Sequence, residues 1–175
     1  MKRLAGWLLS LALLCGWAGA QNPGRLPPSD QARLLSRNRA LLQATVAGSL
    51  ELADSDSALE RADSCQRLVR VWLREVEAAA RSGDVSRAVE MGDYMSKLAD
   101  RGVASNLRAA RKQIPPSTVE ERQLLQRRDE AVRDLEQIEG VLTELARSQS
   151  DLKALLDQVQ SVRRIVAAAA DSPKP

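Results

Sequence analysis

Apolar residues recur at steps of three and four through most of this chain, the spacing that places side chains on one face of an α-helix. The most regular run alternates steps of four and three in a heptad pattern. Its members are Ala58, Ala62, Cys65, Val69, Trp72, Val76 and Ala79. No stretch has the alternating pattern of a β-strand. We therefore expect an all-α fold, an antiparallel bundle of about four helices.

The first 20 residues have the pattern of a secretory signal peptide. Lys2 and Arg3 precede an uncharged, leucine-rich segment, and Ala18-Gly19-Ala20 supplies small residues for cleavage. We expect cleavage after Ala20 and export to the periplasm or the exterior. The alternatives are an uncleaved membrane anchor and a lipoprotein attached through Cys15.

Export leaves a mature chain with balanced charge. Removing 20 of 175 residues leaves 155, enough for one domain with a hydrophobic core. Removing Lys2 and Arg3 from the 26 basic residues leaves 24, against 23 acidic residues. This balance argues against a nucleic-acid-binding protein. We expect a protein partner, either a second copy or another envelope protein, and no stable membrane anchor after cleavage.

Turn and capping residues divide the mature chain. Residues 21–28, with three prolines and a glycine, indicate a flexible arm, and residues 29–114 a region of three helices. The second helix begins at Ser57, which with Glu60 forms a capping box. The first helix carries an apolar pattern of Leu34, Leu35, Leu41, Leu42, Val46 and Leu50.

After Pro115-Pro116, residues 117–170 predict one long, coiled-coil-like C-terminal helix, followed by a tail at 171–175. We define its apolar stripe as the C-terminal seam: Leu135, Ile138, Leu142, Leu145, Leu152, Leu155 and Val159. Polar residues interrupt this seam at 148–150. The absence of Pro and Gly there favours a continuous helix, and the alternative is a break at 148–150.

Charge predicts which ends of the third and fourth helices are neighbours. The third helix ends in cations such as Arg111, and the fourth begins with Glu120 and Glu121. Each sign suits its own helix end, and opposite signs would face each other across the turn at Pro115-Pro116.

The composition excludes most catalytic and metal sites. Without histidine there is no Ser-His-Asp triad, Cys-His dyad or histidine metal ligand. The phosphate-binding glycine motifs are absent as well. The acidic pairs Glu75 with Glu77 and Glu120 with Glu121 are the candidates for a carboxylate-only enzyme, which is a remote alternative. We expect no enzyme activity, no cofactor and no metal.

Cys65 is the one cysteine left after signal cleavage, so an internal disulfide is excluded. Its place on the apolar pattern beside Ala62 and Val69 predicts a buried hydrophobe. The alternative is a free thiol that pairs with a second chain. Trp72, on the same pattern, is expected to anchor the core, and the alternative is a binding hot spot.

Two short segments resemble known families. Gly83-Asp84 and Ala88 resemble the middle of a tetratricopeptide repeat, but Gly92 stands where the repeat has an aromatic residue. Residues 142–146, Leu-Thr-Glu-Leu-Ala, resemble the LTxxQ box of helical periplasmic stress-adaptor and chaperone proteins, with Ala146 in place of the glutamine.

These observations predict an exported, non-enzymatic helical protein that acts by self-association or by binding another envelope or extracellular protein. A long last helix would project beyond the other three, so we expect the C-terminal seam to be the interaction surface. The alternative function is a helical periplasmic chaperone or stress-sensing module that binds unfolded chains.

Overall fold

The structure, a computed structural model, describes residues 28–171, apart from some side chains between residues 30 and 37. The expected signal peptide, nearly all of the expected arm at 21–28 and the tail after Asp171 lie outside the described residues. By its contacts the chain divides into two units, 1–39 and 40–175. The described part of the first unit is the beginning of helix α2 (Pro28–Ala53).

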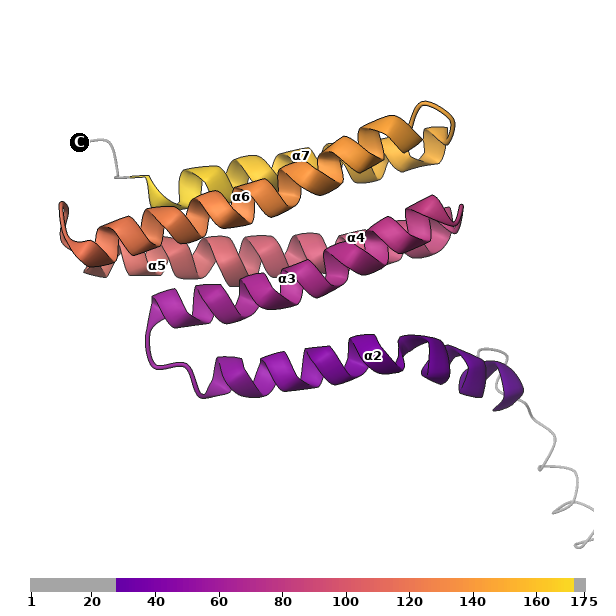
Figure 1. Ribbon diagram of the computed structural model, residues 1–175, viewed down its shortest axis with the longest axis horizontal. Helices are drawn as coiled ribbons and strands as arrows, with labels where there is room; N and C mark the ends of the chain where they lie inside the picture. The colour runs from indigo at the N-terminus through magenta and orange to yellow at the C-terminus, as the bar shows by residue number, and fades with distance from the viewer. Residues whose placement is uncertain (1–27, 172–175) are drawn as a thin grey trace, which may run out of the picture. The chain divides into compact units, whose positions relative to one another are not determined.

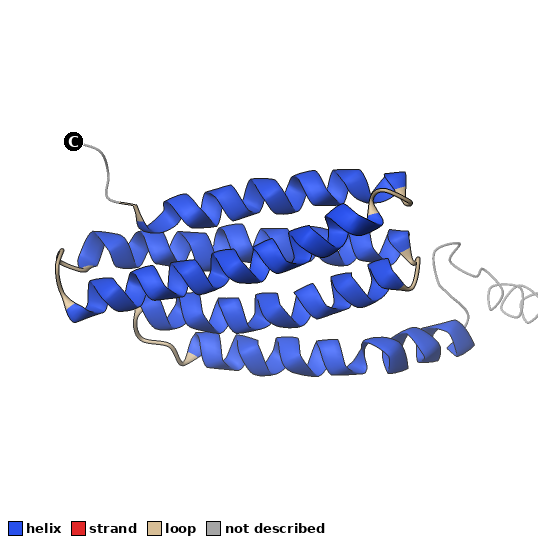
Figure 2. Ribbon diagram, turned by 45° about the horizontal axis from the view of Figure 1, so that its top comes forward, coloured by secondary structure: helices blue, strands red, loops and turns tan. Residues whose placement is uncertain are grey.

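The described residues form helices joined by short turns, with no strand among them, so the predicted all-α fold is confirmed (Figure 2). Within residues 40–171, the helices pack side by side as a bundle (Figure 1). Helix α3 (Ala58–Arg81) contacts both α4 (Val85–Leu98) and α6 (Val119–Leu145). Helix α7 (Lys153–Ala167) contacts α6 and α4.

The start of α3 is fixed by the predicted capping box. The backbone N–H of Glu60 donates to the Ser57 hydroxyl at 3.1 Å, and the N–H of Ser57 donates to the Glu60 carboxylate at 3.0 Å. Each side chain thus satisfies a backbone donor that has no partner within the helix. The helix ends before Gly83, whose positive φ of 76° suits a residue without Cβ.

Helix α4 continues into a π-helical segment, η2 (Ala99–Ala104), and then into α5 (Ser105–Gln113). Its buried residues recur every four positions, at Met91, Met95, Ala99, Val103 and Leu107. In an α-helix each such step overshoots a full turn by about 40°, so this stripe would wind away from the core. The wider π turn keeps it facing inward. The helix is therefore continuous through Gly102.

The turn between α5 and α6 has the expected charge pairing. Thr118 caps α6 by accepting a hydrogen bond from the N–H of Glu121 at 3.2 Å. The Glu121 carboxylate accepts from the backbone N–H of Ser117 and forms an ion pair with Arg111. The cationic end of α5 and the acidic start of α6 therefore meet around Pro115-Pro116.

The C-terminal part of the chain is not the continuous helix that we expected. Helix α6 ends at Leu145, and the chain turns through residues 146–149 into a 3₁₀ turn, η3 (Ser150–Leu152), before α7. The N–H of Gln149 closes the turn on the carbonyl of Leu145 at 2.9 Å. The turn removes the polar residues 148–150 from the seam. Folding back also buries the seam without the entropy cost of associating with a second chain.

Glycines permit close approach of helices in this largely aliphatic core. A Cβ at Gly92 of α4 would lie 2.2 Å from a methyl carbon of Leu155 in α7, and Leu155 is 1% exposed. A Cβ at Gly140 of α6 would meet no atom within 4 Å. The same substitution therefore has opposite consequences at these two helical sites.

We predict that Gly92→Ala destabilises the protein by about 1 kcal/mol, because overpacking costs about 1–3 kcal/mol and the helix propensity of alanine returns about 1 kcal/mol. Gly140→Ala should stabilise it by about 1 kcal/mol, since propensity acts there alone. Urea unfolding followed by circular dichroism measures both changes. Equal effects of the two variants would contradict the close approach of α4 and α7.

The Glu121 contacts predict a dependence of stability on pH. The backbone N–H of Ser117 and, next, the Arg111 guanidinium lower the pKa of Glu121 below its ordinary value. A carboxylate with a lowered folded-state pKa contributes stability above its unfolded pKa of about 4.3, and this stability is lost as pH falls through the folded-state pKa.

We therefore expect Glu121→Gln to lower the free energy of unfolding at pH 7. The difference from wild type should shrink as the pH is lowered below about 4, because the wild-type carboxyl is then protonated. Urea unfolding across a pH series gives the measurement. A difference between the two proteins that stays constant from pH 7 to pH 3 would contradict this assignment.

Candidate interaction surface

The structure buries the residues that were expected to form the interaction surface. All members of the C-terminal seam are buried except Leu145, which is half-buried. Leu142, Leu152 and Val159 are 0% exposed, and Leu135, Ile138 and Leu155 are at most 3% exposed. Side chains from α6 and α7 cover each other along the hairpin, and α3 and α4 cover them further. A partner would have to open the bundle to reach this seam.

Ion pairs close the sides of the α6–α7 hairpin. The Arg163 guanidinium of α7 contacts the carboxylates of Glu136 at 3.1 Å and Glu139 at 2.9 Å, both in α6. The Gln160 side-chain amide donates to Glu139 at 3.1 Å. These partly exposed contacts bridge the two helices over the buried leucines and valines and fix their register.

Cys65 is a packed core residue. It is 1% exposed, and its Sγ would lie 2.8 Å from a Cβ placed at Gly102, so α3 approaches the π segment closely there. Burial raises the pKa of the Cys65 thiol, because a thiolate loses solvation in this apolar site. The geometry therefore matches the expectation of a buried hydrophobe.

Exposed apolar side chains gather instead on one helix. Leu42, Val46 and Leu50 of α2 are 49%, 61% and 63% exposed, and we call these three residues the α2 outer face. They are spaced by four and so form one stripe along the helix. No other helix of the described chain exposes three large hydrophobic side chains. Single exposed apolar residues are ordinary, whereas a continuous stripe marks a contact surface.

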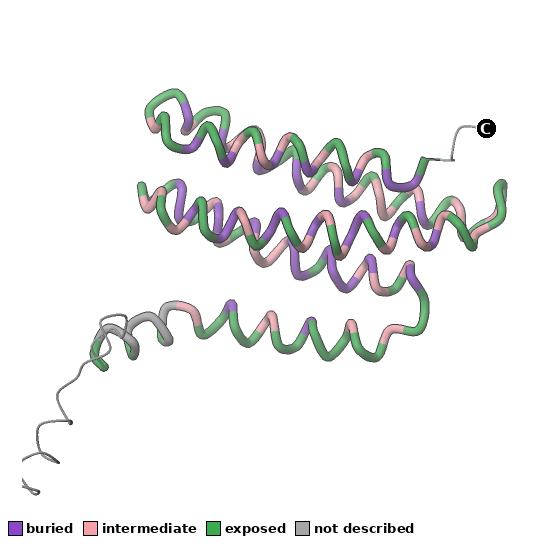
Figure 3. The backbone as a smooth tube through the Cα atoms, turned by 180° about the vertical axis from the view of Figure 1, so that it is seen from behind, coloured by how far each residue is buried: buried purple, intermediate pink, exposed green. Residues whose placement is uncertain are grey.

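The opposite side of α2 holds it to α3. Leu41 is 6% exposed, and Gly48 is buried against Leu68, whose side chain a Cβ at Gly48 would approach to 2.5 Å. Figure 3 shows exposed residues predominating along this part of α2, in contrast to the mixed burial of α3. At 100° per residue, Val46 points about 140° away from Leu41. The α2 outer face is therefore directed away from the bundle.

Polar contacts at the C-terminal end of α2 add to this attachment. The Glu51 carboxylate and the Arg67 guanidinium of α3 form an ion pair at 2.8 Å, and the hydroxyls of Ser55 and Ser64 are 3.5 Å apart. An exposed ion pair of this kind contributes about 0–1 kcal/mol. Residues 40–50 carry no charged side chain. The α2 outer face thus lies on a charge-free length of helix.

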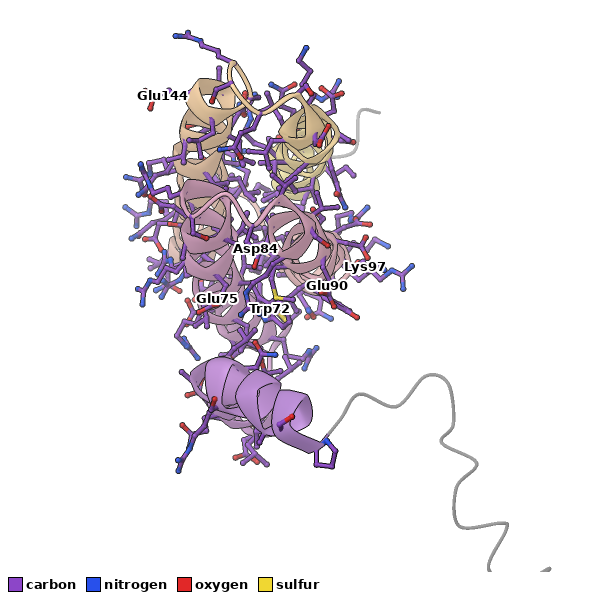
Figure 4. All side chains as sticks on the ribbon, turned by 90° about the vertical axis from the view of Figure 1, so that its right-hand side faces the viewer. Trp72, Glu75, Asp84, Glu90, Lys97 and Glu144 are labelled. Carbon is purple, nitrogen blue, oxygen red and sulfur yellow. The ribbon has the colours of Figure 1, made fainter. Side chains whose placement is uncertain are left out.

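An aromatic pair lies between α3 and α4. The rings of Trp72 and Tyr94 are 5.5 Å apart at an interplanar angle of 48°, and the Lys97 ammonium lies 5.8 Å from the centre of the Tyr94 ring. Seen along the helices, Trp72 lies between these two helices (Figure 4). Trp72 is half-buried and packs on the core as expected, while Tyr94 is 49% exposed.

Three of the four acidic residues considered for catalysis have arginine partners, and the fourth, Glu120, is exposed. Glu75 forms an ion pair with Arg87 at 3.0 Å, Glu77 with Arg81 at 2.9 Å, and Glu121 with Arg111. Among the described residues, no group of three or more His, Cys, Asp or Glu side chains is placed to hold a metal ion. No helix in the same part of the chain is long and apolar enough to cross a membrane.

A pocket of about 550 Å³ opens between the start of α3, the end of α5 and the start of α6. Its wall includes the ion pair of Asp63 with Arg127 at 3.1 Å and the exposed Glu60 that belongs to the α3 capping box. Glu60, Asp63 and Arg127 on this wall are therefore engaged in holding helix ends and neighbouring helices together, whereas Glu120 on the same wall is exposed.

Comparisons with protein-family models, with curated proteins and with solved structures found no match to this chain. The two local resemblances, around Gly83 and at residues 142–146, are therefore not supported by a family match.

The apolar pattern of the first helix contains both the α2 outer face and the buried Leu41, and the sequence alone does not separate them. The spacing of Leu41, Leu42, Val46 and Leu50 predicted one apolar helix face, but the structure buries Leu41 and leaves the other three exposed. The sequence does contain one indication of this outer face. Residues 40–50 carry no charge, and they include three large apolar residues, Leu42, Val46 and Leu50, at intervals of four. A helix packed on one side needs no such uncharged outer side.

The buried position of Cys65 predicts that its thiol reacts slowly in the native protein. Because the thiol is 1% exposed and burial raises its pKa, it should react with a thiol reagent much more slowly in native buffer than in denaturant. An aromatic disulfide reagent releases a chromophore when it reacts with a thiol, and the absorbance of that chromophore measures the rates in native buffer and in denaturant. Equal rates, or a disulfide-linked dimer on a non-reducing gel, would show that Cys65 is accessible.

Proposed function

We propose that this is an exported, non-enzymatic helical protein that acts by binding protein through the α2 outer face. The observation that carries the proposal is that Leu42, Val46 and Leu50 are all about half-exposed or more on one side of one helix. Each would lose apolar contact with water when covered, and such burial contributes about 25 cal/mol for each Å². The C-terminal seam is buried within the chain and offers no exposed apolar surface to a partner.

The rest of the site supports a binding role over a catalytic one. Three of the four candidate carboxylates, Glu75, Glu77 and Glu121, are paired with arginines, and the sequence has no histidine. A helix with one face on its own bundle and an apolar opposite face resembles the helices that proteins use to recognise one another. The proposed location, periplasmic or secreted, rests on the signal-peptide pattern of residues 1–20.

The alternative function, a chaperone or stress-sensing module that binds unfolded chains, remains the second proposal. A basic surface would favour it, because a cationic face attracts a wider range of chains. Residues 40–50 contain no basic residue, which favours a defined protein partner over a general one.

Photo-crosslinking in cells tests the proposed function. A benzophenone amino acid at position 46, the centre of the α2 outer face, should give discrete covalent adducts with protein in the compartment where the chain resides. The same group at Ala47, which is exposed on the flank of the helix, is the matched control.

Adducts at position 46 that exceed those at position 47 support the proposal. Many adducts of different sizes, increasing when unfolded proteins accumulate, would favour the chaperone alternative. A folded protein that gives no protein adduct from position 46 would contradict a binding role for this face.

A further inference from the structure

The apolar pattern on the α2 outer face is symmetric about its centre. Leu42 precedes Val46 by four residues and Leu50 follows it by four. If two copies of α2 pack side by side in opposite directions with Val46 at the centre, Leu42 of each copy meets Leu50 of the other, and the two Val46 side chains meet. The surface is thus complementary to itself under a two-fold rotation.

Exposure permits this approach. The three residues are 49–63% exposed, and they point away from the side of α2 on which Leu41 is buried and Gly48 packs against Leu68 of α3. A second helix can therefore reach them without displacing α3. Ser49, between Val46 and Leu50 in the sequence, is small and leaves room for the helix axes to come close.

Charge further favours a second copy in the antiparallel orientation. Residues 40–50 carry no charge, so two copies bring together no like charges and desolvate no ion. The acids Glu51 and Asp54 lie just beyond Leu50, at one end of the stripe, and both are exposed. An antiparallel pair keeps the acids of the two copies at opposite ends, whereas a parallel pair would place them side by side.

We infer that a second copy of this chain covers the α2 outer face, with the two α2 helices antiparallel about Val46. This inference rests on the proposed function and names the partner at the same surface. The contact is small, because three large side chains from each copy form its centre, and the dimer is expected to be reversible.

Charge substitution tests the register. In Leu42→Lys with Leu50→Lys, both Leu42–Leu50 contacts between the copies become Lys–Lys contacts, and the dissociation constant should rise by at least about tenfold. In Leu42→Lys with Leu50→Glu, the antiparallel register pairs Lys with Glu twice, so association should recover relative to the first variant. A parallel pair would instead place Lys against Lys and Glu against Glu.

Sedimentation equilibrium of the purified protein measures these constants, and circular dichroism checks that each variant keeps its helices. Ala47→Lys, a charge on the flank of the same helix, is the matched control and should leave the constant within about twofold of wild type. As a second measurement, Val46→Cys should form a disulfide-linked dimer on mild oxidation, while Ala47→Cys should not, because position 46 lies on the two-fold axis.

A wild-type protein that stays monomeric at high micromolar concentration overturns the inference. If position 46 still crosslinks to other proteins in cells, the proposed function stands and only the identity of the partner is wrong. A Lys–Glu variant that associates as weakly as the Lys–Lys variant overturns the antiparallel register.

Discussion

The hairpin of α6 and α7 is the contact on which the rest of the bundle depends. Leu142, just before the turn, and Leu152, just after it, are both 0% exposed. From this point the apolar stripe of α7 returns along that of α6, and together they present a surface on which α3 and α4 pack. A projecting helix would have left half of this stripe in water. The turn at residues 146–149 therefore converts one long amphipathic pattern into two layers of a core.

Close approach of helices gives this core its density. Because the core is built from leucine, valine, methionine and alanine, its packing depends on short distances between helices more than on large side chains. Gly92 admits Leu155, and Gly102 lies against Cys65 where the chain is π-helical. The π segment and the glycines have related effects. The π segment keeps the buried side chains of α4 and α5 directed at the core, and the glycines let neighbouring helices approach them closely.

Helix α2 differs from the other helices because its described contacts come from one side. Residues 40–53 reach α3 through Gly48 and the Glu51–Arg67 pair, and Leu41 is buried on the same side. Among the described residues, none covers Leu42, Val46 or Leu50. A bundle that buries its C-terminal seam internally has its remaining large apolar stripe on this helix. That distribution favours the first described helix over the last one as the surface for a partner.

Local chemistry made part of this structure predictable from sequence. The start of α3 at the Ser57–Glu60 box, the cap at Thr118 and the stop at Pro115-Pro116 depend on residues within one turn of each other, so no distant part of the chain is needed to specify them. The burial of Cys65 and the pairing of Arg111 with Glu121 also followed from spacing and charge.

The tertiary structure decided what those patterns could not. A continuous helix and a hairpin place the same seam residues on one face, so periodicity alone does not distinguish them; the contacts of α7 with α6 and α4 do. Periodicity also does not tell that Leu142 is buried and Val46 is exposed. Both belong to regular apolar stripes, and which stripe is covered depends on where neighbouring helices lie, because burial is a property of the assembled surface and not of the residue.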